Sequence, residues 1–363
     1  KVVKKLDNST GYWPSSPGSS LSGGTESYTS GDAHYWGVWW GKEDFESYNQ
    51  KVPRFMSEFG FQSFPEFSSV DKYTNETDYD IYSEVMKSHQ RSSIGNSTIE
   101  DYMLRYYNKP NSFKGYLYVS QILQAYGVSM GMEAHRRNKG YSMGSLYWQL
   151  NDCWPVASWS SIDYFGKWKA LHYSTKKAFQ PVLISFFKSD SEIELHIISD
   201  LLESKDVDLN LKVLSFSGEV LYEINKKYLL QQNSTIKAES LSIEWLNKNF
   251  DPNSSLLVAS LFSNEIEISN NNYYLSEFKD IKLTKPLIEY KIVELINTFE
   301  VSLTSKNLVK NVFVDIDSNQ NFSDNYFDII PGEVYKISIK KDQSLTLDDI
   351  KRKINFLSLF DTY

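Results

Sequence analysis

The feature that most constrains the fold of this 363-residue chain is an abrupt change of pattern near residue 180. Residues 1–180 hold eight of the nine tryptophans and 15 of the 17 glycines, whereas the rest consists of short runs in which apolar and polar residues alternate. Alternation with a period of two is typical of half-buried antiparallel strands. The sequence therefore predicts at least two structural units, with the ligand chemistry in the first.

The first unit, residues 1–180, has the order strand, long helix, strand, helix. This order is typical of a parallel sheet or barrel. A complete (β/α)8 barrel takes about 250 residues, so we expect only the C-terminal part of one here. The predicted elements are a buried strand over 53–60, helices over 99–107 and 114–138, a buried strand over 142–150 and a helix over 169–179.

The rest of the chain predicts two antiparallel β-sandwiches, over residues 181–284 and 285–363. Turn residues separate its alternating runs, as is typical of sandwich domains. The tract Asn270–Asn272 is predicted to be a loop. The alternating runs lie at 192–199, 207–213, 219–222, 301–303, 309–314 and 334–339.

Charge and motifs exclude several classes of function. A net charge of -8 disfavours a nucleic-acid binder, which needs clustered Lys and Arg. No apolar run is long enough to cross a membrane. The only cysteine, Cys153, excludes an intrachain disulfide, and the five histidines lack metal-site spacing. Phosphate-binding and nucleophilic-serine motifs are absent, so we expect no metal and no cofactor.

Glu58 is the strongest candidate for a catalytic group. It ends a predicted buried strand and precedes Phe59 and Gly60, where the backbone must turn. In parallel α/β folds a functional group at the carboxyl end of a strand faces the ligand. The alternative is a structural carboxylate paired with a neighbour such as Arg54.

Aromatic and amide side chains gather in the sequence around Glu58. A sugar site needs flat apolar platforms beside fixed hydrogen-bonding groups, and Trp and Tyr provide both. The alternative is that these rings fill a core or an interface. The candidate substrate-binding residues are His34, Tyr35, Trp36, Trp148, Asn151 and Asp152.

Three motifs together resemble the β-mannosidases of glycoside hydrolase family 2. They are Gly31-Asp32-Ala33-His34-Tyr35-Trp36, Ser57-Glu58-Phe59-Gly60-Phe61-Gln62-Ser63-Phe64-Pro65 and Tyr147-Trp148-Gln149-Leu150-Asn151-Asp152-Cys153-Trp154-Pro155. A weaker match, Phe322-Ser323-Asp324-Asn325-Tyr326-Phe327, extends the resemblance to the end of the chain. The resemblance implies the end of a catalytic TIM barrel followed by two immunoglobulin-like β-sandwiches.

The resemblance also implies an activity and residue roles. Glu58 would be the nucleophile of a retaining exo-β-mannosidase that removes terminal, non-reducing β-D-mannose from oligosaccharides and glycoprotein glycans. Trp148 would close the sugar pocket, and His34 and Tyr35 would hold the nucleophile or the sugar hydroxyls. The substrate would thus be a carbohydrate.

The sequence departs from the family at the acid/base residue. Family members use a Glu preceded by Asn on an earlier strand, but no carboxylate upstream of Glu58 follows an Asn. We expect this residue, any targeting segment and the N-terminal barrel half that packs against this chain to lie upstream. A general acid contributes about 10²- to 10⁴-fold, so the chain alone is expected to be inactive.

Two other functions are compatible with the sequence. One is another family 2 exo-glycosidase, an exo-β-glucosaminidase or a β-galactosidase, although the sequence around Glu58 favours a mannosidase. The other is a non-catalytic carbohydrate-binding or scaffold module.

Six N-x-S/T sequons predict glycosylated surface loops. With the acidic pI and the eukaryotic members of the family, they favour a lysosomal glycoprotein over a secreted or cytoplasmic enzyme. The sequons are at Asn8, Asn75, Asn96, Asn233, Asn253 and Asn321.

Overall fold

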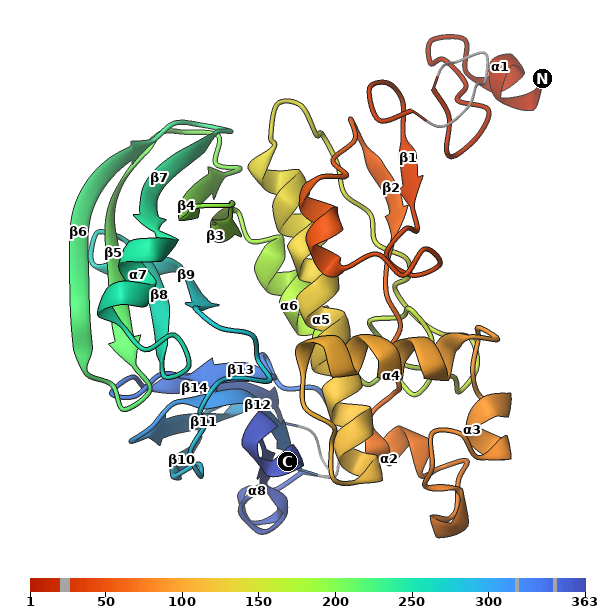
Figure 1. The fold of residues 1–363 in the computed structure, drawn as a ribbon. Helices are drawn as coiled ribbons and strands as arrows, with labels where there is room; N and C mark the ends of the chain where they lie inside the picture. Colours follow the sequence, from red (N-terminus) through yellow and green to blue (C-terminus); the bar gives the residue numbers. More distant parts are fainter. Residues whose placement is uncertain (20–26, 317–319, 342–344) are drawn as a thin grey trace.

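A computed structural model of the chain describes residues 1–19, 27–316, 320–341 and 345–363. A helical part with a short parallel sheet lies beside two β-sandwiches (Figure 1). The long helix α5 (Phe113–Arg137) runs through the middle of the molecule, between the short sheet and the sandwiches. This is the predicted fold class, the C-terminal portion of a barrel followed by two sandwiches.

The parallel sheet consists of β1 (Ala33–Tyr35) and β2 (Met56–Phe59), with His34 opposite Glu58 and Tyr35 opposite Phe59. β2 therefore confirms the strand predicted around Glu58. The other short elements of this part are α1 (Val2–Leu6), η1 (Phe45–Asn49), α2 (Phe67–Val70), η2 (Glu76–Asp78) and α3 (Glu84–Ser88).

The strand predicted over 142–150 is wrong as a continuous element. The segment runs beside β2, where the Met56 amide donates to Gly144 O at 3.0 Å and the Leu146 amide donates to Met56 O at 2.8 Å. The Trp148 amide then donates to Phe59 O at 2.8 Å. These contacts place the segment next to β2, but the ladder is interrupted and contains only an isolated bridge there.

The three longer helices confirm the helical predictions. Ser112 caps α5 by accepting a hydrogen bond from the Gly115 amide, and Gly140, with a φ of 93°, follows its C-terminal end. The first of the three begins at Gly95, four residues before its predicted start at residue 99. The other two helices are α4 (Gly95–Tyr106) and α6 (Ala170–Ala178).

Apolar side chains from α4, α5 and α6 form one large core with β1 and β2. Glycines let α5 approach the aromatic rings of this core. A Cβ at Gly131 would lie 2.6 Å from the Phe59 ring, and one at Gly127 would lie 2.2 Å from the Phe45 ring. The helix thus fixes the position of the strand that carries Glu58.

The first sandwich packs a three-stranded sheet, β3-β4-β7, on a four-stranded sheet, β6-β5-β8-β9. Val, Ile and Leu at alternating positions of both sheets form its core. Its elements are β3 (Val182–Lys188), β4 (Glu192–Ser199), β5 (Lys205–Ser215), β6 (Val220–Leu230), β7 (Thr235–Ser242), α7 (Ile243–Asn249), β8 (Ser255–Ser263) and β9 (Ile266–Tyr274).

The second sandwich pairs the sheets β10-β11-β14 and β13-β12-β15 around its own core. A small cluster that includes Phe216, Tyr274 and Leu308 joins the two sandwiches. The elements of the second sandwich are β10 (Ile288–Glu294), β11 (Thr298–Ser305), β12 (Val309–Asp315), β13 (Phe327–Ile329), β14 (Tyr335–Lys340), α8 (Leu347–Lys353), β15 (Asn355–Leu357) and η3 (Leu359–Thr362).

The loop predicted at Asn270–Asn272 is wrong. All three residues lie in β9 and pair with Val258, Ala259 and Ser260 of β8. Asparagine is depleted in strands, but here the ladder to β8 supplies the backbone hydrogen bonds. The asparagine side chains are therefore held at fixed positions on a sheet.

Candidate active site

The carboxylate of Glu58 is held by two side chains from the preceding strand and the turn after it. The indole Nε1 of Trp36 donates to Glu58 Oε1 at 2.9 Å, and Nδ1 of His34 lies 3.6 Å from Oε2. About a quarter of the Glu58 side chain, 24%, is exposed. The carboxylate is therefore oriented but remains accessible.

The local sequence explains this geometry. Parallel pairing sets His34 opposite Glu58, while the next pair, Tyr35 and Phe59, turns into the core. Gly60 then lets the chain containing Trp148 come close, because a Cβ at Gly60 would lie 2.3 Å from the Trp148 carbonyl oxygen. The glutamate thus lies where two neighbouring strand segments end together.

A second layer of hydrogen bonds lies behind His34. The Ser16 hydroxyl lies 3.0 Å from His34 Nε2 and 2.6 Å from Asp32 Oδ2. The same Asp32 oxygen accepts from the Ser57 hydroxyl at 2.5 Å, and Oδ1 accepts from the Gly18 amide at 2.9 Å. These hydrogen bonds lower the pKa of Asp32 although its partial burial opposes them.

Four tryptophans form a cluster beside Glu58. The ring of Trp159 packs edge to face on Trp36 and Trp39, with 5.9 Å and 5.5 Å between ring centres. The centre of the Trp40 ring lies 6.5 Å from that of Trp159. Trp39 is fully buried, whereas Trp40 is 55% exposed. The cluster is therefore part core and part surface, and the alternative interpretation, that the rings fill a core, holds for Trp39.

Trp148 is 45% exposed. It follows a segment in which Met143 and Leu146 are also exposed, at 62% and 55%. Its backbone is fixed by the hydrogen bond to Phe59, so the strand that carries Glu58 also sets the position of this indole. Such an exposed ring can serve as an apolar platform.

Tyr35 does not join the group around Glu58. Its side chain is buried, its hydroxyl donates to Glu43 Oε2 at 2.6 Å, and its ring packs on Tyr48. The alternative pairing of Glu58 with Arg54 is also not found, because the Arg54 guanidinium lies 5.0 Å from the centre of the Tyr141 ring. The groups that hold Glu58 are Trp36 and His34.

Asn151 and Asp152 belong to the loop after Trp148. Asn151 is exposed. Asp152 is buried, and its two oxygens accept from the hydroxyls of Ser158 at 2.6 Å and Ser160 at 2.5 Å. Burial raises the pKa of Asp152, although Lys169 opposes the shift. The Asp152 carboxylate therefore stabilises the loop in which it lies.

Lys169 is a residue that the sequence analysis missed. It is 1% exposed, and its ammonium donates to the carbonyl oxygens of Ser63 at 3.2 Å and Ser158 at 3.3 Å. Burial lowers its pKa to about 8. It ties the chain beyond β2 to the loop beyond Trp148. No motif marks this lysine, but Asp32, also missed, stands inside the first motif, two residues before His34.

The expectation that every sequon lies in a surface loop is wrong for Asn96. It is buried in α4, its amide nitrogen donates to Ile81 O at 2.5 Å and its oxygen accepts from Gln90 at 2.7 Å. Asn321 is half-buried and accepts from the Trp168 amide at 2.9 Å. The other sequon residues are exposed or half-buried, at Asn8, Asn75, Asn233 and Asn253.

Within the described ranges, no helix has both the length and the apolar character required to cross a bilayer.

Similar proteins are known for the full length of the chain. A Mannosidase Ig/CBM-like domain model matches residues 191–280, and an Ig-fold domain model matches residues 283–362. Goat β-mannosidase is 30% identical over 331 residues, which cover 85% of this chain and 38% of the relative. Mouse β-mannosidase is 26% identical over 392 residues, covering 100% of this chain and 44% of the relative. The chain thus spans well under half of these relatives.

Solved structures of similar fold are also known. A β-D-mannosidase from Dictyoglomus thermophilum is 28% identical with a TM-score of 0.84, over 92% of this chain and 40% of that one. An exo-chitosanase from Amycolatopsis orientalis shares the fold, with a TM-score of 0.69 at 16% identity over 84% of this chain and 42% of that one.

Proposed function

We propose that this chain belongs to the β-mannosidases of glycoside hydrolase family 2 and contributes the nucleophile, Glu58, to a retaining exo-β-mannosidase. The substrate would carry a terminal, non-reducing β-D-mannose, as in oligosaccharides and glycoprotein glycans. The mannosidase names of the most similar relatives support the sugar. The likeness to the exo-chitosanase supports only the fold at its low identity, so the other family 2 glycosidases are not favoured.

The geometry around Glu58 suits a nucleophile. In a retaining glycosidase one carboxylate attacks the anomeric carbon to form a covalent glycosyl-enzyme, which water then hydrolyses. The Trp36 N–H fixes Oε1 of Glu58 at 2.9 Å, and His34 lies beside Oε2. Both contacts orient the carboxylate before attack, which lowers the entropic part of the barrier.

We propose Trp148 as the platform for an apolar face of the mannose ring, with Asn151 and His34 as candidates for its hydroxyls. The exposure of Trp148 and its backbone link to β2 support this assignment. Asp152 and Tyr35 are better described as positioning residues, because their polar atoms are bonded to Ser158, Ser160 and Glu43.

The acid/base group is proposed to come from a part of the enzyme outside this chain. Retention requires a second carboxyl group about 5–5.5 Å from the nucleophile, and among the described residues the polar side chains that hold Glu58 are an indole and an imidazole. The chain also spans only 38% to 44% of the mammalian relatives quoted above. We therefore propose that this chain alone does not turn over substrate efficiently and packs against the rest of a barrel.

The observation that carries the proposal is the accessible Glu58 carboxylate held by Trp36 and His34 at the end of a parallel strand. It is tested by incubating the complete enzyme with a 2-deoxy-2-fluoro mannosyl fluoride, which traps a glycosyl-enzyme. Peptide mass spectrometry is expected to find the label on Glu58. A label on another carboxylate would refute the assignment, and reversible binding without a label would favour a non-catalytic carbohydrate-binding module.

We further propose a lysosomal or secreted glycoprotein that divides into units 1–180, 181–284 and 285–363. Exposed sequons at Asn8, Asn75 and Asn233 support glycosylation. Limited proteolysis that cuts near residues 180 and 284 would support the division.

A further inference from the structure

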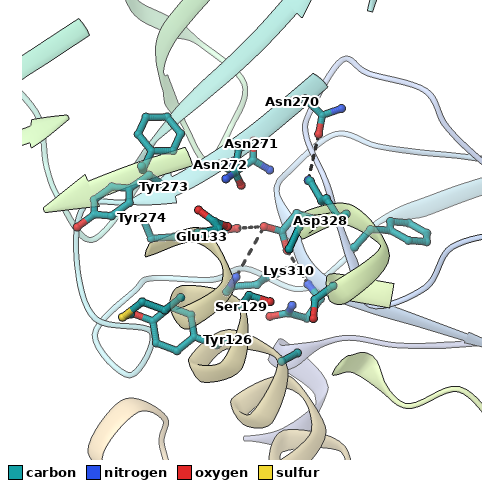
Figure 2. Close-up of a pocket in the computed structure, with 18 of the residues that line it drawn as sticks. Tyr126, Ser129, Glu133, Asn270, Asn271, Asn272, Tyr273, Tyr274, Lys310 and Asp328 are labelled. Atoms are coloured by element: carbon teal, nitrogen blue, oxygen red, sulfur yellow. Dashed lines mark hydrogen bonds and ion pairs between the residues drawn. The ribbon is translucent and has the colours of Figure 1, made fainter. Parts of the chain in front are cut away.

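A large cleft separates the helical part from both sandwiches, with a volume of about 1700 Å³. Its walls come from α5 and α6, from β8 and β9 of the first sandwich, and from β12 to β14 of the second. Figure 2 shows some of the side chains that line it. Among the described residues that line it, neither Glu58 nor Trp148 is present, so the cleft is distinct from the candidate active site.

The helical wall presents one face of α5. Tyr126, Ser129 and Glu133 recur at spacings of three and four residues, so they share that face (Figure 2). The Glu133 carboxylate accepts from the Ser185 hydroxyl at 2.6 Å and lies 3.9 Å from Arg137. Burial raises the pKa of Glu133. The Glu133 carboxylate on this wall is therefore already bonded to neighbouring side chains and is not a free charge.

The opposite wall contains the asparagine tract of β9. Residues 270 and 272 share one face of the strand because their side chains are two positions apart. Asn270 accepts from the Lys177 ammonium of α6 at 3.1 Å, and Asn271 donates to Ile184 O at 2.9 Å. The side chain of Asn272 also lines the cleft (Figure 2). The sheet thus holds the amide groups of Asn270 and Asn272 at fixed positions on one face.

The third wall contains a buried ion pair from the second sandwich. Lys310 lies 3.7 Å from Asp328, and its ammonium is 4.0 Å from the centre of the Tyr274 ring. Asp328 also accepts from the Tyr274 hydroxyl at 2.6 Å and the Asn311 amide at 2.8 Å (Figure 2). These charges are already bonded to one another.

The remaining polar atoms indicate an uncharged, hydroxyl-bearing ligand. The Ser129 hydroxyl and the Asn311 side-chain oxygen are buried, line the cleft and have no hydrogen-bond partner in the described structure. Buried polar atoms are normally satisfied. Acidic lining residues outnumber basic ones by eight to five, which disfavours an anion. Half-buried rings such as Tyr126 and Tyr273 offer apolar faces beside these polar groups.

We propose that the cleft is a second, non-catalytic carbohydrate site that binds a neutral oligosaccharide. Its volume exceeds the 300–1,000 Å³ that is usual for small-molecule pockets, as a ligand of several sugar rings requires. Amides of β9 would bind the hydroxyls, the unpartnered oxygens of Ser129 and Asn311 would gain donors, and Tyr126 would face the C–H surface of a ring. The site does not depend on Glu58 chemistry.

The proposal is tested by titrating this chain with β-1,4-mannotriose, using isothermal calorimetry and heteronuclear NMR. Ser129→Phe fills the cleft from α5, and Asn272→Ala removes one amide. Each is expected to weaken binding by about tenfold or more, equivalent to about 1.4 kcal/mol, and the mannotriose-induced shifts are expected at residues of β9 and α5.

Trp148→Ala and Asn225→Ala are the matched controls, one in the active site and one on β6 away from the cleft. Neither is expected to change the shifts at β9. Binding that disappears with Trp148→Ala but survives Ser129→Phe would overturn the proposal, as would the absence of binding at millimolar mannotriose. Because no turnover is measured, these outcomes are independent of the test of Glu58. Circular dichroism and thermal melting confirm that each variant is folded.

Discussion

Glu58 and the Lys310–Asp328 pair use polar groups in opposite ways. Glu58 keeps 24% of its side chain exposed and is held by one indole hydrogen bond and a nearby imidazole. Lys310 and Asp328 are only 6% and 11% exposed and neutralise one another at a junction between units. The comparison teaches that fixing a carboxylate and burying it are separate tasks. A reactive group needs the first, whereas a domain junction needs both.

The largest expected effect is on the exposed carboxylate. Glu58→Gln preserves the shape of the side chain but removes the nucleophile, so the kcat of the complete enzyme on an aryl β-mannoside should fall by roughly 10³-fold or more. Glu84→Gln, at an exposed position of α3, is the control and should leave kcat unchanged. Comparable turnover by both variants would refute the assignment of Glu58 as the nucleophile, and the residue would then have only a structural role.

The buried pair should respond in stability. Lys310→Met leaves the Asp328 carboxylate buried without its cation and should lower the free energy of unfolding by about 3 kcal/mol. The control is Lys336→Met, whose partner Glu300 lies at 3.1 Å but whose side chain is 60% exposed. It should cost less than about 1 kcal/mol. Urea denaturation measures both, and equal losses would show that burial does not separate them.

His135 should make the helical part sensitive to acid. Burial, assisted by the Arg137 charge, lowers its pKa to about 3. The unfolded chain takes up the proton near pH 6.5, whereas the folded chain stays neutral until about pH 3, so stability falls as pH falls between these values. The loss should be about 2 kcal/mol between pH 7 and pH 5. In His135→Phe the midpoint of urea denaturation should depend less on pH than in the parent chain. The same dependence on pH in both proteins would contradict this prediction.

The smallest effect is expected at the indole. Trp36→Phe keeps the ring against Trp159 but removes the hydrogen bond to Glu58, which is worth about 1.5 kcal/mol for a charged acceptor. In the complete enzyme kcat/KM should fall about tenfold. Trp40→Phe, whose ring meets the same neighbour, is the control. A loss of stability without a loss of kcat/KM would assign Trp36 to the core alone.

The sequence predicted the parts of the molecule in which local pattern and local structure agree. Alternation located β4 at 192–199 without error, and the helix predicted over 114–138 matches α5 (Phe113–Arg137) to within one residue at each end. It failed at 142–150, where the chain continues the sheet through only a few hydrogen bonds, and at Asn270–Asn272, where pairing with β8 overrides the low strand propensity of asparagine.

Site residues divide in the same manner. Glu58 was found from its place at a strand end, and its partner Trp36 lies directly after the neighbouring strand β1. Lys169 could not be found, because it bonds to Ser63, more than 100 residues earlier. The partner of Lys310, Asp328, is close in sequence, but the Tyr274 ring under its ammonium comes from the first sandwich. Only the tertiary fold shows that such lysines are buried.

Helix α5 contacts β2, the strand that carries Glu58, on one side and the cleft beside the sandwiches on the other. Gly131 packs against Phe59, next to Glu58, while Ser129 and Glu133, two residues away in each direction, face the sandwiches. The two compartments therefore share a partition that is one helix thick, about 10 Å. A redesign that moves the backbone of α5 would therefore change both compartments at once, whereas a substitution on the far wall of one would leave the other intact.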